Sequence, residues 1–143
     1  MKKILLFSLV SFALLALAVS GCSKKNNDSA AITMKNVAGT YKLTALTGTV
    51  GGFSANLMDS VPACQRDDNQ KFNADSTYQY IDAGTQCDSS VSGSGTWYIS
   101  GNYFIQDTDT LIIKSFNGSQ LVLTFTDNSF GIPITATETI TKI

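Results

Sequence analysis

The sequence contains no histidine and only one glutamate among its 143 residues. Histidine is the side chain that most often acts as a general acid or base near neutral pH, so its absence removes the commonest catalytic group. Serine is plentiful, but no G-x-S-x-G motif is present to expose one serine as a nucleophile. We therefore expect a protein without enzymatic activity.

An excess of positive charge is also lacking. The chain has 10 Lys and Arg residues against 11 Asp and Glu residues, and no basic cluster lies beyond the first 25 residues. Nucleic-acid binding is therefore not expected, because it requires a basic surface. Threonine, serine, glycine and asparagine are abundant, and this composition favours strands and turns over helices.

The first 21 residues are typical of a secretory leader. Lys2 and Lys3 precede an apolar run over residues 4–19, and small residues follow this run. The run is shorter than the roughly 20 apolar residues of a transmembrane helix. We therefore interpret residues 1–21 as a signal peptide that is removed from the mature protein.

The end of this leader, Val19-Ser20-Gly21-Cys22, resembles the lipobox of bacterial lipoproteins. In that family the cysteine thiol receives a diacylglycerol, the leader is cut directly before the cysteine, and the new amino terminus is acylated. The resemblance implies that Cys22 is the first mature residue and that acyl chains such as palmitate anchor it to a membrane. The alternative is an ordinary leader that ends beside an unmodified cysteine.

The lipobox resemblance has consequences for domain organisation and location. The polar residues 22–36 are expected to be a flexible tether, and residues 37–143 are expected to form one domain. We expect a protein of the cell envelope whose domain lies in the periplasm or at the cell surface. The outer membrane is the favoured membrane for the anchor.

Cys64 and Cys87 are the cysteines that remain if Cys22 carries lipid. An oxidising compartment would allow them to pair. The alternative is a metal site, but two cysteines without histidine cannot complete a tetrahedral zinc site unless carboxylates join them. We therefore expect a disulfide that closes a loop of about 24 residues and contributes roughly 3 kcal/mol. No metal and no cofactor are expected.

Short runs of strand-forming residues alternate with turns from Gly39 to the end of the chain. Residues 73–76 and Asn117-Gly118 have the composition of hairpin turns. In the first run, Tyr41, Leu43 and Ala45 are expected to share one face. Residues 53–58 are expected to form a helical turn or a covering loop. The other expected strands end at Phe72, begin at Tyr78, and cover 96–99, 103–106, 110–116, 120–126 and 134–142.

This pattern amounts to about eight short strands without a convincing helix. It predicts an all-β fold, an antiparallel up-and-down meander. Closing the meander into a β-barrel would leave no unpaired edges. A two-sheet β-sandwich is the alternative.

The domain also resembles a known family. Gly39-Thr-Tyr41 is similar to the glycine-x-tryptophan opening strand of lipocalins, with tyrosine in place of tryptophan. The later motifs are similar to the lipocalin-like domains of small Gram-negative lipoproteins, except that Ser76 stands where glycine is usual. The resemblance implies a lipocalin-like barrel over roughly residues 37–143. The later motifs are Pro62–Asp68, Phe72–Tyr78, Cys87-Asp88 and Gly95–Trp97.

A lipocalin-like barrel can enclose a small apolar ligand, and six residues are candidates for lining that space. The aromatic candidates also suit an ordinary packed core, and the core is the favoured interpretation. Glu138 is different, because a buried carboxylate without a partner is costly. Either a polar cavity lets Glu138 meet a ligand, or a bulge turns Glu138 outward, and the bulge is favoured. The six candidates are Tyr41, Tyr78, Tyr80, Trp97, Leu123 and Glu138.

Two groups of aspartates are candidates for acid–base or metal chemistry. Asp67 and Asp68 are adjacent, so they point to opposite sides of a strand, and a solvated loop is the favoured interpretation. Asp107, Asp109 and Asp127 could together chelate calcium, but the segment lacks the ligand pattern of an EF-hand. Turn formation is therefore favoured over a calcium site.

Two functions remain open from the sequence. The first is a lipid-anchored, lipocalin-like barrel that binds a small apolar molecule or serves as a passive surface module. The second is a protein-binding module, such as a hydrolase inhibitor or an accessory subunit of an envelope complex. A cavity would favour the first function. A filled barrel with an exposed aromatic loop at Gly51-Gly52-Phe53 would favour the second.

Overall fold

The fold is an antiparallel barrel, and the computed structural model describes residues 30–87, 93–128 and 131–143 of it. The first strand, β1 (Gly39–Val50), pairs with the last, β9 (Ile134–Lys142), and this pairing closes eight strands into a barrel. A further strand, β2 (Phe53–Asn56), pairs with the end of β1. The predicted up-and-down barrel is confirmed, and the sandwich alternative is wrong.

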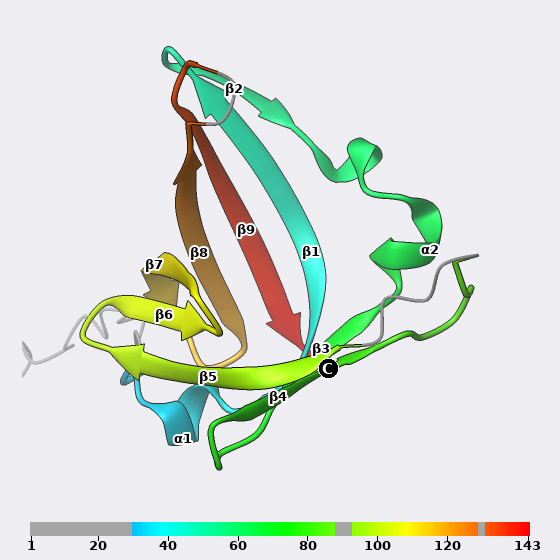
Figure 1. The fold of residues 1–143 in the computed structure, drawn as a ribbon, viewed down its shortest axis with the longest axis vertical. Helices are drawn as coiled ribbons and strands as arrows, with labels where there is room; N and C mark the ends of the chain where they lie inside the picture. The colour runs from blue at the N-terminus through cyan, green and yellow to red at the C-terminus, as the bar shows by residue number, and fades with distance from the viewer. Residues whose placement is uncertain (1–29, 88–92, 129–130) are drawn as a thin grey trace, which may run out of the picture.

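Strands β1, β8 and β9 lie side by side in the upper part of the view, with β9 antiparallel to its two neighbours, and strands β3, β4 and β5 cross near the lower end (Figure 1). Among the described residues, three short helical segments accompany the strands. Within the described ranges, no helix is long and apolar enough to cross a bilayer. The remaining strands are β3 (Asn69–Phe72), β4 (Thr77–Ile81), β5 (Ser94–Ser100), β6 (Tyr103–Gln106), β7 (Asp109–Phe116) and β8 (Gln120–Asp127). The helical segments are α1 (Met34–Val37), η1 (Met58–Ser60) and α2 (Ala63–Arg66).

Side chains of the turn residues hold the predicted hairpins. Between β3 and β4, Asp75 Oδ1 accepts hydrogen bonds from the Thr77 amide at 3.0 Å and the Thr77 hydroxyl at 2.6 Å. Ser76 has a φ of 72°, in the left-handed region that favours glycine. This conformation explains why glycine suits that position of the motif. Between β7 and β8, Asn117 Oδ1 accepts from the Gln120 amide at 2.7 Å.

The lower end of the barrel, called here the closed end, is sealed by the segment that precedes β1. Ala30 N donates to Phe116 O at 3.0 Å, and Ala30 and Met34 pack against the core. Tyr41 donates its hydroxyl proton to Val37 O at 2.5 Å. Residues 30–36, which the sequence analysis assigned to a flexible tether, therefore belong to the packed domain.

Ten buried residues fill the closed end with a largely aromatic core. Phe72 lies at its centre, 5.3 Å from Trp97 and 5.1 Å from Phe104 between ring centroids. Trp97 is fully buried and donates Nε1–H to Asn73 O at 2.9 Å. The ten residues are Val37, Tyr41, Phe72, Trp97, Phe104, Ile113, Phe116, Leu121, Leu123 and Ile140.

The inward face of β1 changes part-way along the strand. Leu43 pairs with Ile140, but the register with β9 then shifts, and Ala45 pairs with Thr139. The extra residue of this β-bulge reverses the alternation of side chains. Ala45 is consequently exposed, and Leu46 instead pairs with Glu138. The expectation that Ala45 shares a face with Tyr41 and Leu43 is wrong for this reason.

Candidate ligand-binding cavity

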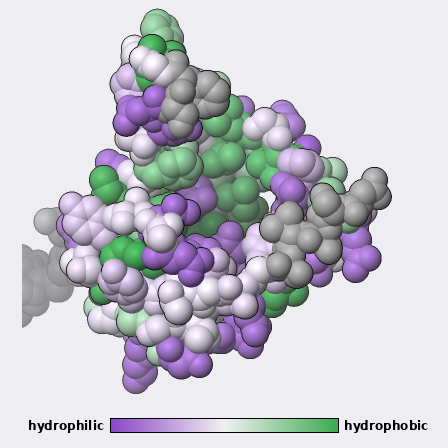
Figure 2. All heavy atoms as spheres, viewed as in Figure 1, coloured by the Kyte–Doolittle hydropathy of each residue, from purple (hydrophilic) through white to green (hydrophobic). Residues whose placement is uncertain are grey.

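A cavity of about 190 Å³ lies inside the barrel above the aromatic core. Its walls come from strands that are distant in sequence, and the space-filling view shows a hollow with hydrophobic residues inside it on this side of the molecule (Figure 2). The residues that line the cavity combine apolar side chains with a few polar groups, as in many small-molecule sites. The lining residues are Tyr41, Leu43, Val61, Gln65, Asp68, Gln70, Tyr80, Glu138 and Ile140.

Residues 57–66, called here the covering segment, close one side of this cavity. Leu57 N donates to Leu46 O at 2.8 Å, and the Leu57 side chain packs so closely on Gly48 that a Cβ there would lie 2.7 Å from Leu57 Cδ1. Val61 and Gln65 then contribute to the cavity wall. The sequence predicted a covering loop here, but residues 53–56 form strand β2 and the covering segment follows it.

A disulfide between Cys64 and Cys87 ties the covering segment to the chain beyond β4. The predicted pairing is confirmed. Because Gln65 follows Cys64 directly, the bridge also holds a cavity-lining residue in place. Arg66 supports the same segment, since its Nε–H donates to Val61 O at 2.8 Å.

Asp68 and Tyr80 form a hydrogen-bonded pair in the cavity wall. The Tyr80 hydroxyl donates to Asp68 Oδ2 at 2.8 Å, and the Ala83 amide donates to Asp68 Oδ1 at 3.0 Å. Burial, together with the bond to Asp68, raises the pKa of Tyr80 to about 12. Asp67 accepts from the Thr85 amide at 2.8 Å. The interpretation of Asp67 and Asp68 as a solvated loop is wrong, because both carboxylates anchor the chain after β4.

Glu138 faces the interior. It lies between Ala136 and Ile140 on the inner face of β9 and lines the cavity. The favoured expectation, that a bulge turns Glu138 outward, is wrong. The bulge of this strand pair lies in β1, where it changes the direction of Ala45, and Glu138 stays inside. Among the described residues, Glu138 has no hydrogen-bond or ion-pair partner. Burial raises the pKa of this carboxyl group above its ordinary value.

The structure separates the six candidate ligand-lining residues into two groups. Tyr41, Tyr80 and Glu138 line the cavity. The other three do not line it: Trp97 and Leu123 are buried in the aromatic core, and the Tyr78 hydroxyl donates to Asp107 Oδ2 at 2.6 Å. The lining residues that the sequence pattern did not indicate are Leu43, Val61, Gln65, Asp68, Gln70 and Ile140. For Leu43 and Ile140, strand alternation was a usable signal.

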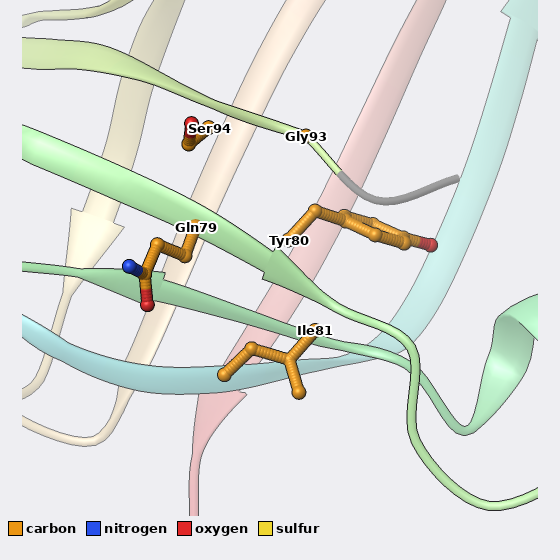
Figure 3. A pocket seen from close by; sticks show the side chains of 5 residues that line it. All are labelled: Gln79, Tyr80, Ile81, Gly93 and Ser94. Atoms are coloured by element: carbon orange, nitrogen blue, oxygen red, sulfur yellow. The ribbon is translucent and has the colours of Figure 1, made fainter. Parts of the chain in front are cut away.

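A second, more open hollow lies where β4 and β5 separate. It is lined by Gln79, Tyr80, Ile81, Gly93 and Ser94 (Figure 3). Gln79 and Ile81 point to one side of β4, while the Tyr80 ring extends to the other side, toward β1. Tyr80 therefore borders both spaces. The cavity is the better candidate site, because it is more enclosed and collects side chains from four strands and the covering segment.

Asp107, one of the three aspartates that could chelate calcium, has a structural role. Asp107 adopts a φ of 51° in the turn between β6 and β7, and its carboxylate accepts hydrogen bonds from Tyr78 and from the Thr96 amide at 2.8 Å. This arrangement agrees with the favoured interpretation as a turn. Within the part of the chain that the structure describes, no group of three or more acidic or cysteine side chains could hold a metal ion.

A family model for a lipocalin-like domain matches residues 37–131, which is well over half of the chain. The chain belongs to the lipocalin-like domain family. No curated protein and no solved structure matches it. The match covers β1 to β8, so this lipocalin-like domain is completed by β9, the strand that closes the barrel and carries Glu138.

Proposed function

We propose that this protein is a lipid-anchored protein of the cell envelope whose barrel binds a small ligand without chemically changing it. The observation that carries the proposal is the cavity between β1, β3, β4 and β9. Lipocalin-like barrels are suited to small-ligand binding, and this cavity offers apolar walls together with the unpartnered carboxylate of Glu138. A cavity of about 190 Å³ suits a small molecule better than a long acyl chain.

The anchoring part of the proposal rests on the lipobox resemblance at Cys22, which lies outside the described residues together with the leader. The described chain begins at Ala30, beside Phe116 at the closed end. Residues 22–29 can extend to roughly 28 Å, at about 3.5 Å per residue. An anchor at Cys22 would hold the closed end near the membrane and leave the covering segment accessible.

Calorimetric titration of the purified protein with three small probes tests the binding function. The probes are hexanol, hexylamine and hexanoate, which share an apolar chain and differ in the charge of the head group. We expect saturable binding of at least one probe. Val61→Trp, which places a large side chain at the cavity wall, should abolish it. Val50→Trp is the matched control, because Val50 is 37% exposed at the end of β1.

If Val61→Trp still binds the probe, the probe binds outside the cavity. If none of the three probes binds saturably, the ligand-binding function is contradicted. Native mass spectrometry of the freshly purified protein adds an independent readout. A co-purifying small molecule that is lost in Val61→Trp but kept in Val50→Trp would identify the bound chemistry.

A second candidate function is supported by the exposed aromatic residue Phe53. Its side chain is 85% exposed directly after the Gly51-Gly52 turn, and Ile132, in the connection before β9, is 53% exposed. The turn between β1 and β2 and the start of β9 lie at the end of the barrel opposite α1 (Figure 1). An exposed aromatic residue is typical of a protein-binding surface. Under this alternative, Phe53→Ser should abolish complex formation with an envelope protein and leave probe binding unchanged.

A further inference from the structure

The charges around the cavity have one sign. Its lining includes the carboxylates of Glu138 and Asp68 and the amides of Gln65 and Gln70, but none of the described lining residues is Lys or Arg. The two carboxylate oxygens of Asp68 already accept hydrogen bonds, one from the Tyr80 hydroxyl and one from the Ala83 amide. The interior therefore presents one unpartnered carboxylate and two amides to a ligand.

Basic side chains close in sequence to the lining residues do not line the cavity. Lys42 and Lys71 lie on the opposite strand faces from their neighbours Tyr41, Leu43 and Gln70, because side chains alternate along a strand. Two further basic side chains have partners elsewhere. Lys142, on the same face of β9, donates to Asn36 O at 2.6 Å and lies 5.6 Å from the centre of the Tyr41 ring at the closed end. Arg66 donates to Val61 O, and its Nη1 lies 3.7 Å from Asp59 Oδ1. Neither cation lines the cavity, so neither neutralises Glu138.

An unpaired carboxylate in such a place is energetically unfavourable. Moving a charge out of water is costly, and the cost is recovered only when an opposite charge or hydrogen-bond donors approach it. Burial accordingly raises the pKa of Glu138. A cationic donor that entered the cavity would provide the missing partner.

The rest of the wall suits an apolar body attached to that donor. Leu43, Val61 and Ile140 provide aliphatic surface, and the rings of Tyr41 and Tyr80 provide aromatic surface. Aromatic rings also attract cations. An anionic head group would instead meet Glu138 as a like charge, with no basic residue in the wall to bind it.

We propose that the cavity selects small ligands that carry a protonated amine on an apolar body, with Glu138 as the residue that binds the amine. This inference rests on the proposed ligand-binding function and adds the chemical class of the ligand. The amine would donate to the Glu138 carboxylate, and the apolar body would lie against the aliphatic and aromatic wall.

The same three probes test the selection. At about pH 8 the amine is protonated and hexanoate is ionised. We expect hexylamine to bind roughly 10-fold to 100-fold more tightly than hexanol, because a hydrogen bond to a charged group contributes about 1.5–3 kcal/mol. Hexanoate should bind most weakly.

Glu138→Gln keeps the shape of the side chain and removes its charge, so it should reduce hexylamine affinity to about that of hexanol. Asp109→Asn is the matched control, because Asp109 is an exposed carboxylate in β7 away from the cavity. It should leave all three affinities unchanged. Thermal unfolding of both variants verifies that they are folded.

The outcomes distinguish the inference from the function on which it rests. If hexanol or hexanoate binds as tightly as hexylamine, and Val61→Trp blocks that binding, the cavity binds ligands but the amine selection is wrong. If Glu138→Gln leaves hexylamine affinity unchanged, Glu138 is not the amine-binding residue. If no probe binds saturably, the ligand-binding function itself is wrong.

Discussion

The Tyr80 hydroxyl donates a 2.8 Å hydrogen bond to Asp68 Oδ2 and thereby joins β4 to the residue that precedes β3. Asp68 is only 7% exposed, so its carboxylate depends on protein donors in place of water. Both residues also line the cavity. The same hydrogen bond therefore contributes to barrel stability and to the shape of the candidate site.

Tyr80→Phe should lower the free energy of unfolding by about 1.5–3 kcal/mol, because it removes a hydrogen bond to a buried charged group. Chemical denaturation of the purified protein measures this change. Tyr98→Phe is the control, since Tyr98 is 48% exposed in β5, and it should change stability by less than about 0.5 kcal/mol. Equal stability of the two variants would show that the Tyr80–Asp68 hydrogen bond contributes nothing.

Reduction of the Cys64–Cys87 disulfide should destabilise the protein and loosen the covering segment. The bridge separates its cysteines by 23 residues, and closing a loop of this length stabilises a fold by roughly 3 kcal/mol. A decrease of roughly ten degrees or more in melting temperature is expected for a domain of this size. Probe binding should weaken as well, because Gln65 lines the cavity beside the bridge.

The double variant Cys64→Ala/Cys87→Ala separates loss of the bridge from other effects of the reductant. It should melt at the temperature of the reduced protein, and added reductant should not lower that temperature further. A melting temperature that is unchanged by reduction in the parent protein would contradict the stabilising role.

The raised pKa of Glu138 predicts an unusual dependence of stability on pH. Because the folded state binds this proton more tightly than the unfolded chain, the free energy of unfolding rises as the pH falls through the folded-state pKa. The rise ends below the ordinary value of 4.5, where both states are protonated. Glu138→Gln should lack this rise and should be more stable than the parent protein at neutral pH.

Other titratable groups act differently in that pH range, so the difference between parent and variant reports on Glu138. Tyr41 and Tyr80 have raised pKa values and remain protonated. Asp107 has a lowered pKa, so its contribution to stability is lost only at lower pH. Denaturation curves for both proteins across this range measure the difference. Parallel pH profiles would contradict the assignment to Glu138.

Cys22→Ser should block lipid addition if the lipobox resemblance reflects the processing of this chain. The variant is expected to lose the acyl mass and to leave the membrane fraction, or to persist as an uncleaved precursor. Cell fractionation and intact-mass measurement distinguish these results. Ser23→Ala is the control and should stay in the membrane fraction. Normal membrane localisation of Cys22→Ser without loss of acyl mass would contradict this anchor.

Local sequence determined the strands and most of the turns. Alternating side chains predicted the strand β9, and Asn117-Gly118 and residues 73–76 predicted two hairpins that the structure confirms. These features depend on neighbours within a few residues, because turn conformation and strand alternation are local properties. The disulfide was also predictable from the lipobox resemblance, since Cys64 and Cys87 are the two cysteines that remain to pair if Cys22 carries lipid.

Tertiary structure decided which inward residues border empty space. Tyr78 and Tyr80 lie two positions apart on one face of β4, yet only Tyr80 lines the cavity, because Tyr78 lies toward the aromatic core. The bulge between Leu43 and Ala45 depends on pairing with β9, about 95 residues away, so alternation within β1 could not predict it. The isolation of Glu138 likewise depends on which side chains four other elements bring to it, and periodicity along one strand carries no information about them.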